Sequence, residues 1–321
     1  DGGAIYLSGK KNDTGEDYTA SNASYCTIFD GNFTKNKSDG AGGAVCADGY
    51  SILYVKGGTF ENNAAATTGG GINVYSSCLR MSDGKISGNT AVSTNGSTGF
   101  GGGLNLTAGS VADITGGTIE NNQSNSGGGI YANGKSSFTA SNLKITGNTA
   151  ATNGGGICIP GTKDYEYNVS LENVLIQGNK SESGCGAGIY AARAWKEETS
   201  TGVLTLKNCQ IKENYSTVAG GGIYLDKGVT ATMDGGEISG NHVINPTSQT
   251  NGGGIAVGGT FTLNSGKISD NIKDGSWNGG AAASVSGTFT MNGGEVSGNI
   301  DTCTAENAEN RTIGGGAFYV L

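Results

Sequence analysis

Apolar and polar residues alternate in short runs that recur along the whole chain. In one unit, Ile72 and Val74 are followed by Leu79 and Met81, and then by Ile86. A spacing of two places both side chains of a pair on the same face of a β-strand. No stretch shows the spacing of an amphipathic helix. The pattern therefore predicts three short strands in each unit and an all-β fold.

Glycine and asparagine mark the two ends of each unit. Glycines precede the first apolar residue, as in Gly-Gly-Ala-Ile at 2–5 and Gly-Gly-Gly-Ile at 69–72. The unit closes on a tetrad that starts with an apolar residue and ends with asparagine. Self-similarity of this kind is typical of a repeat architecture. The tetrads end at ten asparagines: Asn36, Asn63, Asn89, Asn122, Asn148, Asn179, Asn214, Asn241, Asn271 and Asn299.

Two repeat architectures could hold three strands per unit. A propeller blade needs four longer, antiparallel strands, whereas these runs are short. Units stacked in register give a parallel coil that rises about 4.8 Å per rung, and the crossover rule favours a right-handed turn. We predict a right-handed parallel β-helix, a solenoid of about ten rungs, as a single domain over residues 1–321. Because the chain begins and ends within a repeat, we expect it to be a piece of a longer surface protein.

The asparagines are predicted to form a structural ladder. At a sharp bend, an asparagine side chain can bond both to the backbone and to its stacked copies. Each bond contributes about 1 kcal/mol, and an unpaired buried polar group costs about 1–3 kcal/mol. On the outer face, Glu237, Lys267 and Glu295 hold equivalent positions on consecutive units, which predicts a surface charge ladder.

Composition excludes several classes of function. The net charge is −8, so the chain lacks the basic face that binding to nucleic acid requires. No apolar run is long enough for a membrane-spanning helix, and we expect no membrane insertion by this segment. The seven cysteines show no Cys-x-x-Cys spacing. We therefore expect no metal site and no cofactor.

Gly-Gly-Ala-Ile at 2–5 and Phe-Thr-Lys-Asn at 33–36 resemble the paired GGAI-type and FxxN repeats of the chlamydial polymorphic outer-membrane proteins. Most other copies differ, with Gly-Gly-Gly in the first motif and Ile in tetrads such as the one at 86–89. The resemblance is to a repeat signature and extends over essentially the whole chain. It implies a pectin-lyase-like β-helix that is secreted or displayed on a bacterial surface. Such proteins are often adhesive, and some act on carbohydrates.

Functional residues are expected on loops that lengthen a rung. Two consecutive units carry long loops after the glycine-led strand, and these loops should touch because their units are neighbours. Aromatic rings beside carboxylates can stack on sugars and bond their hydroxyls. Two solvated loops without a ligand are the alternative. The candidate ligand-binding residues are Asp164, Tyr165, Glu166, Tyr167, Arg193, Trp195, Glu197 and Glu198.

A second candidate patch follows the asparagine ladder. Insertions on three successive units are expected to bring His242, Asp274 and Trp277 to one edge. A single histidine is more often an ordinary surface residue than a base, so no catalytic residue is assigned. No regular Thr-x-Thr array is expected to stack on one face, which argues against ice binding.

Two hypotheses for function follow. The first is an extracellular or cell-surface β-helix with a structural or adhesive role, whose loops bind glycans or surface proteins of a host or of the environment. The second is a polysaccharide-active enzyme, a lyase or a glycoside hydrolase, with its site between adjacent long loops. Carboxylate pairs such as Asp164 and Glu166 suit a glycosidase, but the sequence does not set the separation between them.

Overall fold

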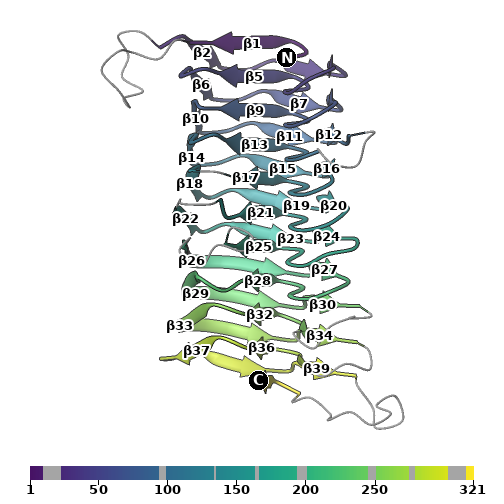
Figure 1. Ribbon diagram of the computed structural model, residues 1–321, viewed down its shortest axis with the longest axis vertical. Coiled ribbons are helices and arrows are strands. Elements are labelled where there is room, and N and C mark those ends of the chain that lie inside the picture. The colour runs from purple at the N-terminus through teal and green to yellow at the C-terminus, as the bar shows by residue number, and fades with distance from the viewer. Residues whose placement is uncertain are drawn as a thin grey trace.

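The computed structural model describes residues 1–9, 23–93, 99–133, 135–162, 166–193, 201–244, 251–274, 279–302 and 316–321. In these ranges the chain forms a parallel β-solenoid of about 9 turns without helices (Figure 1). The predicted all-β solenoid is therefore confirmed. A helix of sufficient length and apolar character to cross a membrane is absent from the same ranges.

Each rung follows one path through three sheets, which we name A, B and C. From β9 (Ile72–Tyr75) in sheet A, the chain enters β10 (Cys78–Met81) and β11 (Lys85–Ser87) in sheet B. It then enters β12 (Thr90–Ala91) in sheet C. The two-residue strand after each asparagine is a fourth element that the sequence pattern did not predict, because two residues carry no alternation.

Sheet A stacks the glycine-led strands in register. Gly101 adopts a φ of +66°, and a side chain at Gly102 would lie 2.5 Å from the carbonyl oxygen of Gly128 on the next rung. Glycine is thus required both for the bend and for the close approach of successive rungs. The 11 strands are β1 (Ile5–Ser8), β5 (Val45–Asp48), β9, β13 (Leu104–Thr107), β17 (Ile130–Ala132), β21 (Ile157–Pro160), β25 (Ile189–Ala192), β28 (Ile223–Leu225), β32 (Ile255–Val257), β36 (Ala283–Val285) and β40 (Phe318–Val320).

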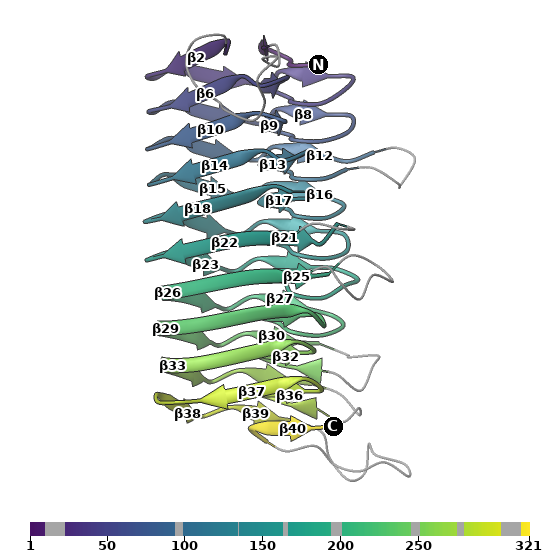
Figure 2. The same cartoon turned by 60° about the vertical axis from the view of Figure 1, so that its left-hand side comes forward.

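Sheet B combines the middle strands and the tetrad strands, and Figure 2 shows its middle strands stacked toward the viewer. On three rungs the middle strand and the tetrad strand merge into one continuous strand. The 17 strands are β2 (Tyr25–Ile28), β3 (Asn32–Thr34), β6 (Ile52–Val55), β7 (Thr59–Glu61), β10, β11, β14 (Val111–Ile114), β15 (Thr118–Glu120), β18 (Ser137–Ser141), β19 (Lys144–Thr146), β22 (Tyr167–Glu172), β23 (Leu175–Gln177), β26 (Gly202–Lys212), β29 (Val229–Ser239), β33 (Thr260–Ser269), β37 (Thr288–Met291) and β38 (Glu295–Ser297).

Sheet C closes each rung, and a pair of two-residue strands lies apart from it. The 10 strands of sheet C are β4 (Lys37–Ser38), β8 (Ala64–Ala65), β12, β16 (Gln123–Ser124), β20 (Thr149–Ala150), β24 (Lys180–Ser181), β27 (Tyr215–Ser216), β30 (His242–Val243), β34 (Ile272–Lys273) and β39 (Ile300–Asp301). The separate pair is β31 (Asn251–Gly252) and β35 (Gly279–Gly280).

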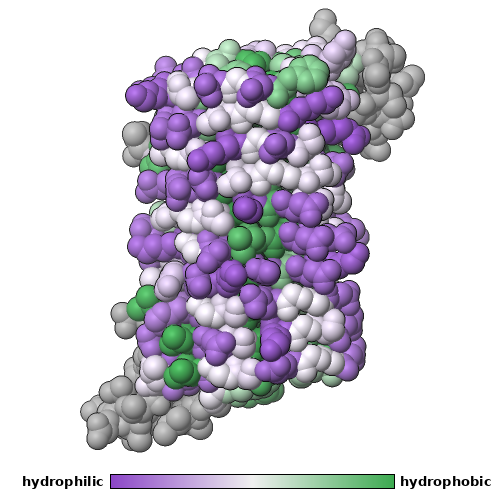
Figure 3. Space-filling view, turned by 180° about the vertical axis from the view of Figure 1, so that it is seen from behind, coloured by the Kyte–Doolittle hydropathy of each residue, from purple (hydrophilic) through white to green (hydrophobic). Residues whose placement is uncertain are grey.

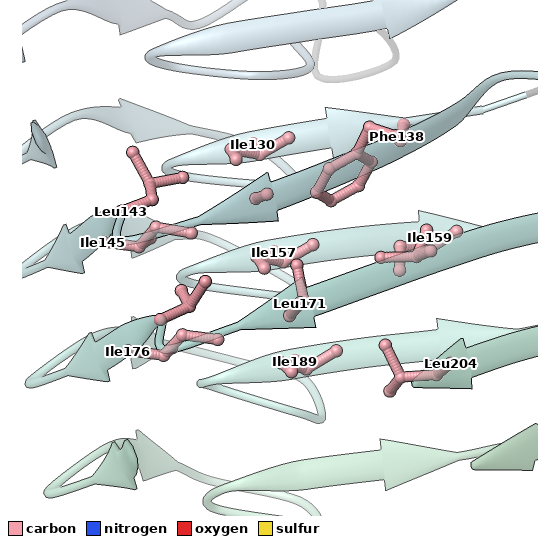
Figure 4. Close-up of a cluster of buried hydrophobic side chains, with 14 of the residues drawn as sticks. Ile130, Phe138, Leu143, Ile145, Ile157, Ile159, Leu171, Ile176, Ile189 and Leu204 are labelled. Atoms are coloured by element: carbon pink, nitrogen blue, oxygen red, sulfur yellow. The ribbon is translucent and has the colours of Figure 1, made fainter. Parts of the chain in front are cut away.

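The core is a stack of similar layers of apolar side chains, of which Figure 4 shows several. In one layer Ile157 and Ile159 from sheet A face Leu171 and Ile176 from sheet B, and all four are at most 1% exposed. Burying such a side chain contributes about 1.5–3 kcal/mol. Because every rung repeats this layer, stability accumulates along the rod and does not depend on one central core.

The asparagines form an uninterrupted ladder along the bend between sheets B and C. The Nδ2 of Asn148 donates to Oδ1 of Asn179 at 3.0 Å and to the carbonyl of Ile119 at 2.9 Å. Its own Oδ1 accepts the backbone N–H and the Nδ2 of Asn122, both at 2.9 Å. The same side-chain bond links every neighbouring pair from Asn36 to Asn299. The charge ladder is also in register, with Lys267 Nζ 3.0 Å from Glu295 Oε2.

Candidate functional site

The first candidate cluster lies at the edge of sheet A where β21 and β25 end. Pro160 and Ala192 are register partners, so the two strands end side by side. The two flanks touch, because the hydroxyl of Thr201 donates to Oε1 of Glu166 at 2.8 Å. Arg193 directly follows β25 at this edge and is half-buried. The remaining loop candidates, Asp164, Tyr165, Trp195, Glu197 and Glu198, lie outside the described residues.

Tyr167 was predicted to bind ligand on the loop, and this prediction was wrong. Tyr167 is the first residue of β22 and faces inward, like Val169, so that it is only 3% exposed. Its hydroxyl has no hydrogen-bond partner within the described part of the chain. Burial, and secondarily the charge of Asp226, raise the pKa of this phenol. Tyr167 therefore belongs to the core.

Two tyrosines outside the predicted set lie at the same edge. Tyr190 on β25 and Tyr224 on β28 are register partners on the outer face of sheet A. Their rings stack with centroids 5.2 Å apart and an interplanar angle of 6°. Asp226 follows β28 directly, and both rings are half-buried. The residue after the first apolar position of each glycine motif faces outward, so aligning that column would have found the pair.

The electrostatics keep these rings neutral. Burial is the main cause that raises the pKa of Tyr190 and of Tyr224, and the carboxylate of Asp226 raises both further. Neutral phenols retain both a stacking face and a hydroxyl that donates and accepts hydrogen bonds. The pair beside a carboxylate can therefore contact an apolar ring face and bond to hydroxyl groups.

The second candidate patch is partly assembled in sheet C. Nε2 of His242 lies 2.5 Å from Oδ2 of Asp274 on the next rung, and the hydroxyl of Thr302 donates to Oδ1 of Asp274 at 2.8 Å. The ring of Tyr215 lies 6.0 Å from that of His242. Trp277 lies outside the described residues. In the ranges that the structure covers, no three His, Cys, Asp or Glu side chains are grouped as a metal site would require.

Threonines form a short regular array on the outer face of sheet B, contrary to the sequence-based expectation. Three consecutive rungs place two threonines each in register. They are Thr230 and Thr232, Thr260 and Thr262, and Thr288 and Thr290. The two columns were missed because they emerge only when outward positions of the merged strands are aligned. The argument against ice binding rested on the expected absence of such threonine columns, and the observed columns remove that argument.

The stacked parallel rungs place this chain in the class of β-helix proteins, and comparison with known families agrees. The chain belongs to the right-handed β-helix family, whose model matches residues 98–265, about half of the 321 residues. Residues 27–48, which include β3 and β4, match the repeat of the Chlamydia polymorphic membrane proteins. This repeat indicates a bacterial surface or outer-membrane protein. No curated protein and no solved structure matches the chain.

Proposed function

We propose that this chain is an adhesive β-helix that binds glycans at the edge of sheet A where its two long loops begin. The observation that carries the proposal is the parallel stack of Tyr190 and Tyr224 beside Asp226. Aromatic faces contact the apolar faces of sugars, and a carboxylate accepts hydrogen bonds from sugar hydroxyls. The rungs hold both tyrosines in fixed register, so little conformational entropy is lost on binding.

The location of the site and the surface character of the rod also support a polar ligand. Long loops on a rigid rod are where binding residues concentrate. Figure 3 shows the side turned away from the viewer of Figure 1, where hydrophilic and neutral residues predominate and hydrophobic side chains gather only in small areas. A face of this kind lacks the large apolar patch that marks a protein interface.

A glycan array probed with the labelled protein tests the proposal. We expect the wild-type chain to bind a restricted set of glycans and Tyr190→Ala with Tyr224→Ala to lose this binding. Tyr75→Ala is the matched control, because Tyr75 is a tyrosine of sheet A that is 50% exposed and outside the site. Unchanged binding by the double variant, or capture of proteins without any glycan, contradicts the proposal.

The hypothesis of a polysaccharide-active enzyme is tested on the same samples. The protein is incubated with plant and mucin polysaccharides, and the products are separated by size. Binding without product formation agrees with the adhesive role. Cleavage that disappears in Glu166→Gln or Glu197→Gln would instead show that the chain is a polysaccharide-active enzyme.

A further inference from the structure

A pocket on the outer face of sheet B lies away from both candidate sites. Tyr54, Arg80 and Asp113 are register partners on β6, β10 and β14, which lie side by side in Figures 1 and 2. Two positions further along the same rungs stand Lys56, Ser82 and Thr115. These six residues and Met81 line a shallow pocket of about 200 Å³. Its position on three consecutive rungs means that the backbone ladder fixes the spacing of the side chains.

The pocket carries a net positive charge, whereas the whole chain is negatively charged. The net charge is −8, yet the pocket combines two cations, Lys56 and Arg80, with one carboxylate. The ammonium of Lys56 lies 5.0 Å from the ring centre of Phe29, which favours its position at the pocket edge. An anion therefore meets a local excess of positive charge here.

The guanidinium of Arg80 is not held by Asp113 in a hydrogen bond. Nη1 of Arg80 lies 3.8 Å from Oδ2 of Asp113, which is beyond hydrogen-bond distance, and both side chains are about half exposed at 56% and 49%. Oδ1 of Asp113 instead accepts the hydroxyl of Thr139 at 2.9 Å. Arg80 can therefore present its planar donors to a ligand, while Thr139 fixes the carboxylate.

We propose that this pocket binds a single sugar residue that carries a carboxylate, such as a terminal sialic or uronic acid. Arg80 and Lys56 bind the carboxylate, because a guanidinium matches its planar geometry with two parallel hydrogen bonds. The ring of Tyr54 contacts the sugar face, and Asp113, Ser82 and Thr115 bond to hydroxyls. The volume is below the roughly 300–1,000 Å³ of drug-sized sites, which suits one ring and not an oligosaccharide.

The pocket is separate from the tyrosine pair, and so it is tested with its own ligands. The probes are the methyl glycosides of sialic acid and of glucuronic acid, each compared with its neutral methyl ester by saturation-transfer NMR and calorimetry. We expect at least one acid to bind and its ester to bind about tenfold or more weakly, because the ester removes charge-assisted hydrogen bonds. The acid that binds identifies the sugar.

The variant Arg80→Gln should weaken binding of that acid by about tenfold or more. Lys267→Gln is the matched control, since it removes the same charge from sheet B where Lys267 pairs with Glu295. Tyr190→Ala with Tyr224→Ala should leave binding of the acid unchanged. Absence of binding, equal affinity for acid and ester, no effect of Arg80→Gln, or full competition by inorganic sulfate would each overturn the proposal.

Discussion

The ring of Tyr167 occupies the space that a side chain at Gly202 would need. The two residues are register partners on β22 and β26, and a methyl group added at Gly202 would overlap Cζ and Oη of the ring. On earlier rungs the same corner is built from serines whose hydroxyls bond to the neighbouring rung. They are Ser51, Ser77, Ser110 and Ser136. The missing side chain at 202 thus admits a large residue at this corner of the core.

We expect Gly202→Ala to destabilise the fold by about 1–3 kcal/mol, the usual cost of overpacking a filled core. Tyr167→Ser restores the residue of the earlier rungs and should remove most of this cost. A double-mutant cycle measured by urea denaturation separates the two effects. If Gly202→Ala costs as much in the Tyr167→Ser background as in the wild-type chain, the proposed overlap does not limit stability.

The asparagine ladder should be far more sensitive in its middle than at its ends. Asn148→Ala leaves the carbonyl of Ile119 and two donors of Asn122 without partners. We expect a loss of at least about 3 kcal/mol in unfolding free energy, because each unpaired buried group costs about 1–3 kcal/mol. Asn36→Ala is the control, since Asn36 is half-buried at the end of the ladder. Equal losses in both variants, measured by urea denaturation, would contradict a cooperative ladder.

The inward-facing side chains could be predicted from the sequence because each of them recurs at the same position of successive units. Ile157 and Ile159 face inward for the same reason as Ile72 and Val74, and a coil that stacks equal positions turns this alternation directly into a core. The asparagine column is as regular, with one residue per rung at a fixed distance from its apolar neighbour. Fold class and register therefore followed from spacing alone.

The candidate site could not be read in the same way. Tyr167 was assigned to a loop because it closes the polar run at 163–167, but alternation with Val169 turns it into the core. Tyr190 and Tyr224 are a pair only because their rungs are adjacent, which no local pattern shows. Outward side chains contact one another between rungs, so such pairs emerge only when the outward positions of successive units are aligned.

Near the C-terminal end of sheet C, a buried ion pair occupies the inward-facing position that small residues hold on earlier rungs. The side chain of Lys273 is 0% exposed, and its Nζ lies 2.8 Å from Oδ1 of Asp301, whose side chain is 5% exposed. Val243 holds the same register position on the preceding rung. We expect Asp301→Asn to cost about 3–5 kcal/mol, because it leaves a buried ammonium without its counter-charge.

Replacing both partners tests whether the pair itself stabilises the rod. Lys273→Val with Asp301→Val should regain most of the stability, since valine already fits this column at Val243 and a buried ion pair gains little over apolar packing. Thermal unfolding of the two variants and the wild type measures the difference. A double variant as unstable as Asp301→Asn would mean that the charges are needed for the local fold.

Buried thiols and phenols should make the rod sensitive to alkali. Burial raises the pKa of Cys46, Cys78, Cys158 and Cys209, and that of Cys185 to about 12. An unfolded thiol has a pKa near 8.5, so above this pH the unfolded chain releases protons that the folded chain retains. The stability contributed by Cys185 is therefore fully present below about pH 8.5 and falls as the pH rises toward 12.

We expect the melting temperature to fall steadily from about pH 8 to about pH 11, and to fall less steeply in Cys185→Ala. One thiol that titrates only in the unfolded state contributes up to about 1.4 kcal/mol per pH unit, and the variant lacks this contribution. Comparing slopes, and not absolute stabilities, removes the packing cost of the substitution. Because Cys185 is not fully buried, solvent reduces the difference, but its sign is fixed by the direction of the pKa shift. Parallel pH profiles for wild type and variant would show that the folded chain does not protect this thiol from ionisation.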